Sequence, residues 1–170
     1  MEYTSYAGRG RSYLNLGDYQ NAEADYKKVL SKWPGVWNTS AYYSELLIAQ
    51  KRYDEADTIL SLRKKIHPEV DTYFGHALIY AAKGQKEQAL DTYKEANPAI
   101  YALLGMKDEA FSVGTKYSDD QLLQRYSFYN ILITNPFYEC LHSDPRWQKI
   151  LEQHKTLYEE NLRKYGTIDL

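Results

Sequence analysis

The feature that most constrains this fold is a set of residue types that returns along the chain with a period of 34 residues. Residues 17–22 (GDYQNA) are matched by 51–56 (KRYDEA), and Pro34 is matched by Pro68. A third copy, 84–89 (GQKEQA), follows after 33 residues. A unit of this size cannot bury its own apolar face, whereas stacked copies share a continuous core. The period therefore predicts one elongated array of helical repeats.

Each unit contains two apolar stretches with helical spacing, separated by a turn. In the first unit Gly17 can take the left-handed conformation that ends a helix. Pro34 stops the next helix because it lacks an amide hydrogen. In the second unit Lys51 stands in place of the turn glycine and Arg63 in place of a small residue. We therefore expect the second unit to be less tightly packed or locally shifted.

With these residues at these spacings, the chain resembles the tetratricopeptide repeat (TPR) family. The resemblance implies an all-α fold, a right-handed α-α superhelix of helix-turn-helix repeats with C-terminal capping helices. The units are expected at about 3–36, 37–70 and 71–98, the last ending near Asn97-Pro98. A shortened fourth unit is expected at 98–116, and a capping segment at 117–170.

The C-terminal part carries two further signals. Residues 118–121 (SDDQ) match a capping box, which predicts a helix through about Ile133. Residues 136–147 (PFYECLHSDPRW) resemble an ending found in many bacterial TPR proteins, including transcriptional regulators and cyclase-like signalling proteins. Ser143 or Asp144 can cap a helix that begins at Pro145 and runs to about Tyr165.

The sequence shows no group of residues with the types and spacing that a catalytic site needs. The four histidines, His67, His76, His142 and His154, lack metal-ligand spacing, and Cys140 is the only cysteine. The Asp119-Asp120 pair is best explained by the dipole of a helix start, and Gly10 by close helix packing. We therefore expect no enzymatic activity, no metal site and no cofactor.

Charge and composition argue against two classes of partner, nucleic acids and membranes. A net charge of −2 and a pI near 6.1 argue against direct binding of nucleic acid. No run approaches the roughly 18 apolar residues that a membrane-spanning helix needs, so no membrane association is expected. The first five residues lack the basic and apolar stretches of a secretory signal, which favours the cytoplasm.

In TPR arrays the first helix of each repeat, helix A, lines a concave groove. The resemblance therefore implies a partner-binding face whose residues here are Arg11, Asn15, Asn38, Tyr42, Glu45, Asp71, Phe74 and Leu78. A groove with Arg11 at one end and aromatic residues along it would suit a peptide with apolar anchors and an acidic group. Only Arg11 matches the cationic residues with which some co-chaperone TPR domains hold a C-terminal carboxylate, so that mode is not expected.

The function that this implies is a non-enzymatic protein–protein interaction module that docks a peptide or protein segment in its groove. The alternative is that the chain is the regulatory or sensory TPR portion of a larger bacterial signalling or transcription-regulator protein. That alternative rests on the resemblance of the ending and on how soon the first repeat begins. A fused output domain would then carry the activity.

Overall fold

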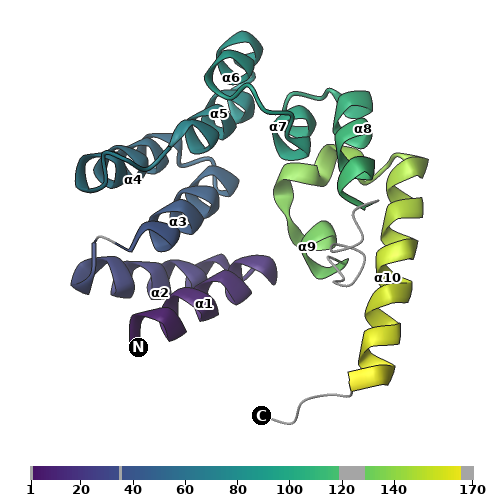
Figure 1. Cartoon of the computed structure of the whole chain (residues 1–170), viewed down its shortest axis with the longest axis horizontal. Coiled ribbons are helices and arrows are strands. Elements are labelled where there is room, and N and C mark those ends of the chain that lie inside the picture. The colour runs from purple at the N-terminus through teal and green to yellow at the C-terminus, as the bar shows by residue number, and fades with distance from the viewer. Residues whose placement is uncertain (1, 35, 119–128, 166–170) are drawn as a thin grey trace. The chain divides into compact units, whose positions relative to one another are not determined.

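In a computed structural model the chain folds into helices (Figure 1). The structure describes residues 2–34, 36–118 and 129–165, and the side chains of 4–34, 36, 38–114 and 132–164. Within these ranges there are helices, turns and loops but no strand, which confirms the predicted all-α fold. The chain divides into two compact units, residues 1–95 and 96–170.

The first unit consists of three helical hairpins, one for each predicted full repeat. Helices α1 (Glu2–Asn15) and α2 (Tyr19–Lys32) form the first, and α3 (Trp37–Ala49) and α4 (Tyr53–Ile66) the second. Helices α5 (Tyr73–Ala82) and α6 (Lys86–Thr92) form the third. Helix α3 packs beside both α1 and α5, so the helix-A positions of successive hairpins are neighbours.

The hairpin turns share one backbone geometry. After α1, Gly17 has a φ of 74° and donates its amide to Leu14, while Asp18 donates to Tyr13. This pair of bonds is a Schellman motif, which satisfies the last carbonyls of a helix. The same two bonds close the turns at Gly84 and, in the second unit, at Gly105.

Lys51 adopts that geometry as well, with a φ of 61° although it is not glycine. Its amide donates to Ile48 and that of Arg52 to Leu47. The local shift expected for the second repeat is therefore absent at its turn, because the hydrogen bonds impose the left-handed conformation on a lysine. Arg63 does occupy a core position, where burial lowers its pKa.

The helix ends follow the proline signals in the first two repeats and depart from them in the third. Helices α2 and α4 end immediately before Trp33-Pro34 and His67-Pro68, as predicted. Helix α6 ends at Thr92, short of the predicted end near Asn97. Tyr93 already has an extended backbone, with φ −127° and ψ 107°, so the chain leaves the helix five residues before Pro98. Asn97 then caps the next helix through its side-chain oxygen.

Close approach of α1 and α2 explains the small residues of the first repeat. Ala22 and Tyr26 of α2 are fully buried. A Cβ added to Gly10 would lie 2.7 Å from Cε1 of Tyr26, so only glycine leaves room for that ring. The prediction that Gly10 serves helix packing is thus confirmed.

The second unit joins the shortened hairpin to the C-terminal segment. Its elements are α7 (Pro98–Leu103), α8 (Lys107–Ser118), α9 (Tyr129–Thr134), the 3-10 helix η2 (Pro136–Leu141) and α10 (Pro145–Tyr165). Ala102, Phe111, Leu141 and Trp147 form its core. The fourth hairpin therefore packs on the terminal segment.

The predicted capping box at 118–121 falls mostly on residues 119–128, outside the described residues, as does the Asp119-Asp120 pair. Ser118 itself is the last residue of α8. By contrast, α10 has the predicted bounds, and Asp144 caps it by accepting a hydrogen bond from the Arg146 amide at 3.0 Å. Local signals were sufficient to define this helix.

Candidate functional site

Three of the predicted binding residues meet on the surface formed by helices α1, α3 and α5, which we call the helix-A face. Nη1 of Arg11 on α1 donates to Oε2 of Glu45 on α3 at 2.6 Å. The Arg11 guanidinium also lies 4.4 Å from the centre of the Tyr42 ring. Arg11 and Glu45 are 34 residues apart, so they hold equivalent positions in adjacent repeats. Stacking of the repeats brings them together.

The Arg11–Glu45 pair is only partly withdrawn from solvent. The side chain of Arg11 is 32% exposed and that of Glu45 is 22% exposed. Burial disfavours the charge of Arg11, but its attraction to Glu45 and the hydrogen bond that it donates to Glu45 outweigh this effect and raise the pKa of Arg11. The Arg11 guanidinium therefore stays charged near neutrality, and Glu45 is its ion-pair partner.

A buried tyrosine lies close to this pair. The Tyr26 side chain is fully buried, and burial raises the pKa of its hydroxyl. The charges of Arg11 and Glu45 both act on that hydroxyl, for which the described residues supply no hydrogen-bond partner. Tyr26 thus links the helix-A face to the core of the first repeat.

The remaining predicted residues do not join this group. Asn15 is half-buried on α1, and Asn38 is exposed in the first turn of α3. Asp71 accepts a hydrogen bond from the amide of Tyr73 at 2.6 Å, just before α5 begins. Their side chains offer separate polar positions along the face.

The two apolar members of the predicted face differ in accessibility. Phe74 on α5 is half-buried and packs edge-on against Tyr93, with the ring centres 5.4 Å apart. Leu78 is 1% exposed and belongs to the core. Since a partner has no access to Leu78, the surface available on α5 is narrower than the sequence suggested.

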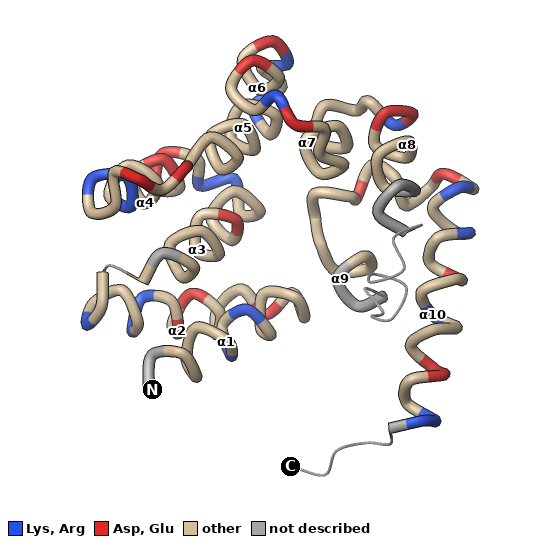
Figure 2. The backbone as a smooth tube through the Cα atoms, in the orientation of Figure 1, with Lys and Arg blue, Asp and Glu red and all other residues tan. Residues whose placement is uncertain are grey.

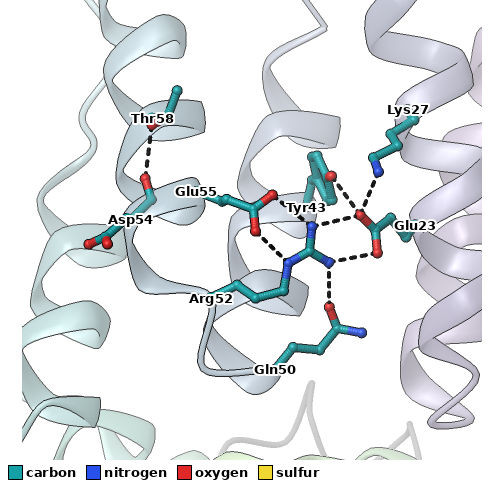
Figure 3. Close-up of polar contacts among 8 residues, drawn as sticks. All are labelled: Glu23, Lys27, Tyr43, Gln50, Arg52, Asp54, Glu55 and Thr58. Carbon is teal, nitrogen blue, oxygen red and sulfur yellow. Dashed lines mark hydrogen bonds and ion pairs between the residues drawn. The ribbon is translucent and has the colours of Figure 1, made fainter.

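An ion-pair network that the sequence analysis missed ties the first repeat to the second (Figure 3). Arg52 binds both oxygens of Glu23 on α2, at 2.8 and 3.0 Å, and also both oxygens of Glu55. Tyr43 on α3 donates to Glu23 at 2.9 Å, and Lys27 lies 2.8 Å away. Arg52 and these partners hold the pKa of Glu23 down to about 2. The spacing of 29 residues between Glu23 and Arg52 gave no signal in the sequence.

The segment Ser143–Trp147 makes packing contacts within the second unit. Arg146 binds Asp144 and also reaches Asp108 on α8 at 2.7 Å. Its guanidinium lies 4.2 Å from the centre of the Phe111 ring. Trp147 is 3% exposed and stacks on His142. These contacts fasten α10 to the fourth hairpin.

The histidines and the cysteine make local contacts. Nδ1 of His76 lies 2.8 Å from the Thr72 carbonyl, and Nε2 lies 3.4 Å from Asp57. Sγ of Cys140 donates to the Ala102 carbonyl, and burial raises the pKa of this thiol. In the described part of the chain, His, Cys, Asp and Glu side chains nowhere form a group of three that could hold a metal ion. Among the described helices, none combines the length and apolar character needed to cross a bilayer.

Comparison with known families supports the repeat assignment. A tetratricopeptide repeat model matches residues 13–75, and a second tetratricopeptide repeat model matches 70–97. The chain belongs to the tetratricopeptide repeat family. No curated protein and no solved structure matched it. TPR repeats characterise protein–protein interaction modules, and the family typically consists of non-catalytic scaffolds. The family matches end at residue 97, so the fourth hairpin and the terminal segment lie beyond them.

Proposed function

We propose that this TPR protein docks a peptide or protein segment on its helix-A face. The observation that carries the proposal is the meeting of Arg11, Tyr42 and Glu45 from adjacent repeats on a partly exposed surface. Asn38 and Phe74 extend that surface along α3 and α5. Polar groups that fix orientation beside half-buried aromatic rings are the usual composition of a protein-binding surface.

The energetic requirement is modest. A micromolar complex corresponds to about −8 kcal/mol. Two or three well-buried aromatic or arginine contacts supply much of the binding energy in such interfaces, at about 2 kcal/mol or more each. Tyr42 and Phe74 are the candidates for aromatic contacts, because each keeps part of its ring accessible.

Site-specific photocrosslinking tests this proposal. A photoreactive amino acid replaces Asn38, which is exposed on α3, and in a matched variant it replaces Gln20, which is exposed at the start of α2. Both positions are exposed helix residues, so neither substitution should alter the melting curve. Asn38 is the better reporter than Arg11, since loss of Arg11 would leave Glu45 without its cation.

The variants are incubated with lysate of the source organism and irradiated. We expect a protein that crosslinks from Asn38 and not from Gln20. Equal crosslinking from both positions would contradict binding at the helix-A face. Crosslinking from Gln20 alone would place the interaction on the opposite helices of the array.

A further inference from the structure

Charge is distributed unevenly between the two helices of each hairpin in the first unit. Helices α1, α3 and α5 contain only four charged residues, which are Glu2, Arg9, Arg11 and Glu45. Helix α4 alone contains six, and α2 contains five. In Figure 2 the tubes of α3 and α5 are accordingly mostly tan, whereas α4 carries both blue and red. Helices α1, α3 and α5 are therefore nearly neutral, and Asp71, just before α5, adds one exposed carboxylate at the end of the helix-A face.

The charges that do lie on these helices are already engaged within the chain. Arg9 binds both oxygens of Asp25 on α2, at 2.7 and 2.8 Å, and Asp25 is buried. Arg11 is held by Glu45 at 2.6 Å. Among the described side chains of α1, α3 and α5, each charged group thus has an internal ion-pair partner. An incoming charge would find no uncompensated charge of opposite sign among these described side chains.

Glu45 stands where a partner's carboxylate would otherwise bind. Its Oε2 accepts from Nη1 of Arg11, and the Tyr42 ring packs near the same guanidinium. A second carboxylate that approached Arg11 would lie within a few ångströms of Glu45. Arg52 does hold two carboxylates, but there Lys27 supplies a second cation beside Glu23. The contacts of Arg11 within the described residues are Glu45 and the Tyr42 ring, neither of which is a cation. Like charges so close cost several kcal/mol at an interface when no second cation balances them, so an acidic side chain would be repelled at Arg11.

We propose that Glu45 is the specificity-determining residue of the helix-A face. Glu45 neutralises Arg11 through their ion pair. The helix-A face therefore accepts an uncharged peptide segment with aromatic or apolar anchors and rejects an acidic one. This inference rests on the proposed function and names the chemistry of its partner. The sequence had suggested a peptide with an acidic group for Arg11. The inference drops that group, because Glu45 of the chain itself is already paired with Arg11. Binding should depend only weakly on salt, since no net charge is exchanged.

Selection of random peptides displayed on phage tests the inference, because it samples peptide chemistry broadly and does not require an identified partner. The full chain is immobilised as wild type, as Glu45→Gln and as the control Glu23→Gln. Glu45→Gln keeps the shape of the side chain but leaves Arg11 without a carboxylate. Glu23→Gln likewise removes a partly buried carboxylate from an arginine, here Arg52, but on α2 rather than on the helix-A face. Selected peptides are located by photocrosslinking from Asn38 and Gln20.

We expect the wild type and Glu23→Gln to select peptides with no more Asp and Glu than the starting library. Glu45→Gln should enrich Asp and Glu several-fold. For a wild-type peptide, changing a contacting Gln or Asn to Glu or Asp should weaken binding to the wild type about tenfold and strengthen binding to Glu45→Gln.

Two kinds of failure are distinguishable. Peptides that crosslink from Asn38 but are acidic in the wild-type pool, or remain neutral in the Glu45→Gln pool, would overturn the role of Glu45 and leave the docking face intact. Peptides that crosslink only from Gln20, or the absence of any enriched peptide, would contradict the docking face itself and the inference with it.

Discussion

The two glycines of helix α1 offer a sharp test of how the first repeat is packed. Gly8 and Gly10 are separated by a single residue in the same helix, but they face different surroundings. A Cβ added at Gly8 would have no atom within 4 Å. At Gly10 it would lie 2.7 and 3.0 Å from two ring carbons of Tyr26, a fully buried side chain. The same substitution, glycine to alanine, therefore adds a methyl group to open space at position 8 and against a buried ring at position 10.

The magnitudes follow from two effects. Replacing glycine by alanine inside a helix stabilises it by about 1 kcal/mol, and this gain applies to both variants. Gly10→Ala also forces the Tyr26 ring or the backbone to move, and overpacking of this kind costs about 1–3 kcal/mol. Gly8→Ala should thus raise the free energy of unfolding, whereas Gly10→Ala should leave it about 1–3 kcal/mol below that of Gly8→Ala.

Urea unfolding followed by far-ultraviolet circular dichroism measures this difference. The double variant Gly10→Ala/Tyr26→Leu serves as a further control, because removing the ring should relieve the clash and make the two substitutions non-additive. Equal stability of Gly8→Ala and Gly10→Ala would refute the packing of α1 against Tyr26. Additivity in the double variant would mean that Tyr26 is not the residue that Gly10 accommodates.

Three other predictions concern the turn, the ion-pair network and the second unit. Lys51→Gly should stabilise the chain by about 0.5–1 kcal/mol in urea unfolding, because a φ of 61° strains a lysine, while Lys51→Ala should change little; similar values for the two would contradict this. Arg52 and its neighbours lower the pKa of Glu23 from 4.5 to about 2. The shift corresponds to an upper bound of about 3 kcal/mol of stability, which solvent screening reduces. This stability is present above about pH 4.5 and is lost as the pH falls toward 2. The difference in free energy of unfolding between wild type and Glu23→Gln should therefore shrink as the pH falls over that range. A difference that stays constant would show that the charge of Glu23 does not supply this stability. Trp147→Ala should destabilise the second unit by about 3–5 kcal/mol in thermal unfolding, whereas Leu162→Ala on the same helix, 41% exposed, should cost under about 0.5 kcal/mol; comparable losses would contradict the core position of Trp147.

Several elements were predictable because their signals are local. Gly17 and Gly84 mark helix ends, and a capping residue followed by Pro145 marks the start of α10. Such signals act through hydrogen bonds and backbone conformations a few residues apart. The end of α6 was mispredicted because the proline signal at Pro98 marks only where a helix must have stopped, whereas the backbone already turns extended at Tyr93.

The candidate site was predictable only as a set of positions. The helix-A register placed Arg11, Tyr42 and Glu45 on one face, but no sequence signal paired Arg11 with Glu45 or Arg52 with Glu23. Leu78 was assigned to the same face, yet packing of its neighbours buries it. Pairing and burial depend on how side chains from different hairpins pack, which the register of a single helix does not specify.

By itself, the amino-acid sequence determined the repeat, the all-α fold and the TPR family, because period, turn residues and apolar spacing are properties of short segments. Only the tertiary structure decided which charges on the helix-A face are already neutralised. The physical reason is that an ion pair depends on distances of a few ångströms between residues 34 positions apart, and those distances exist only after the repeats have stacked.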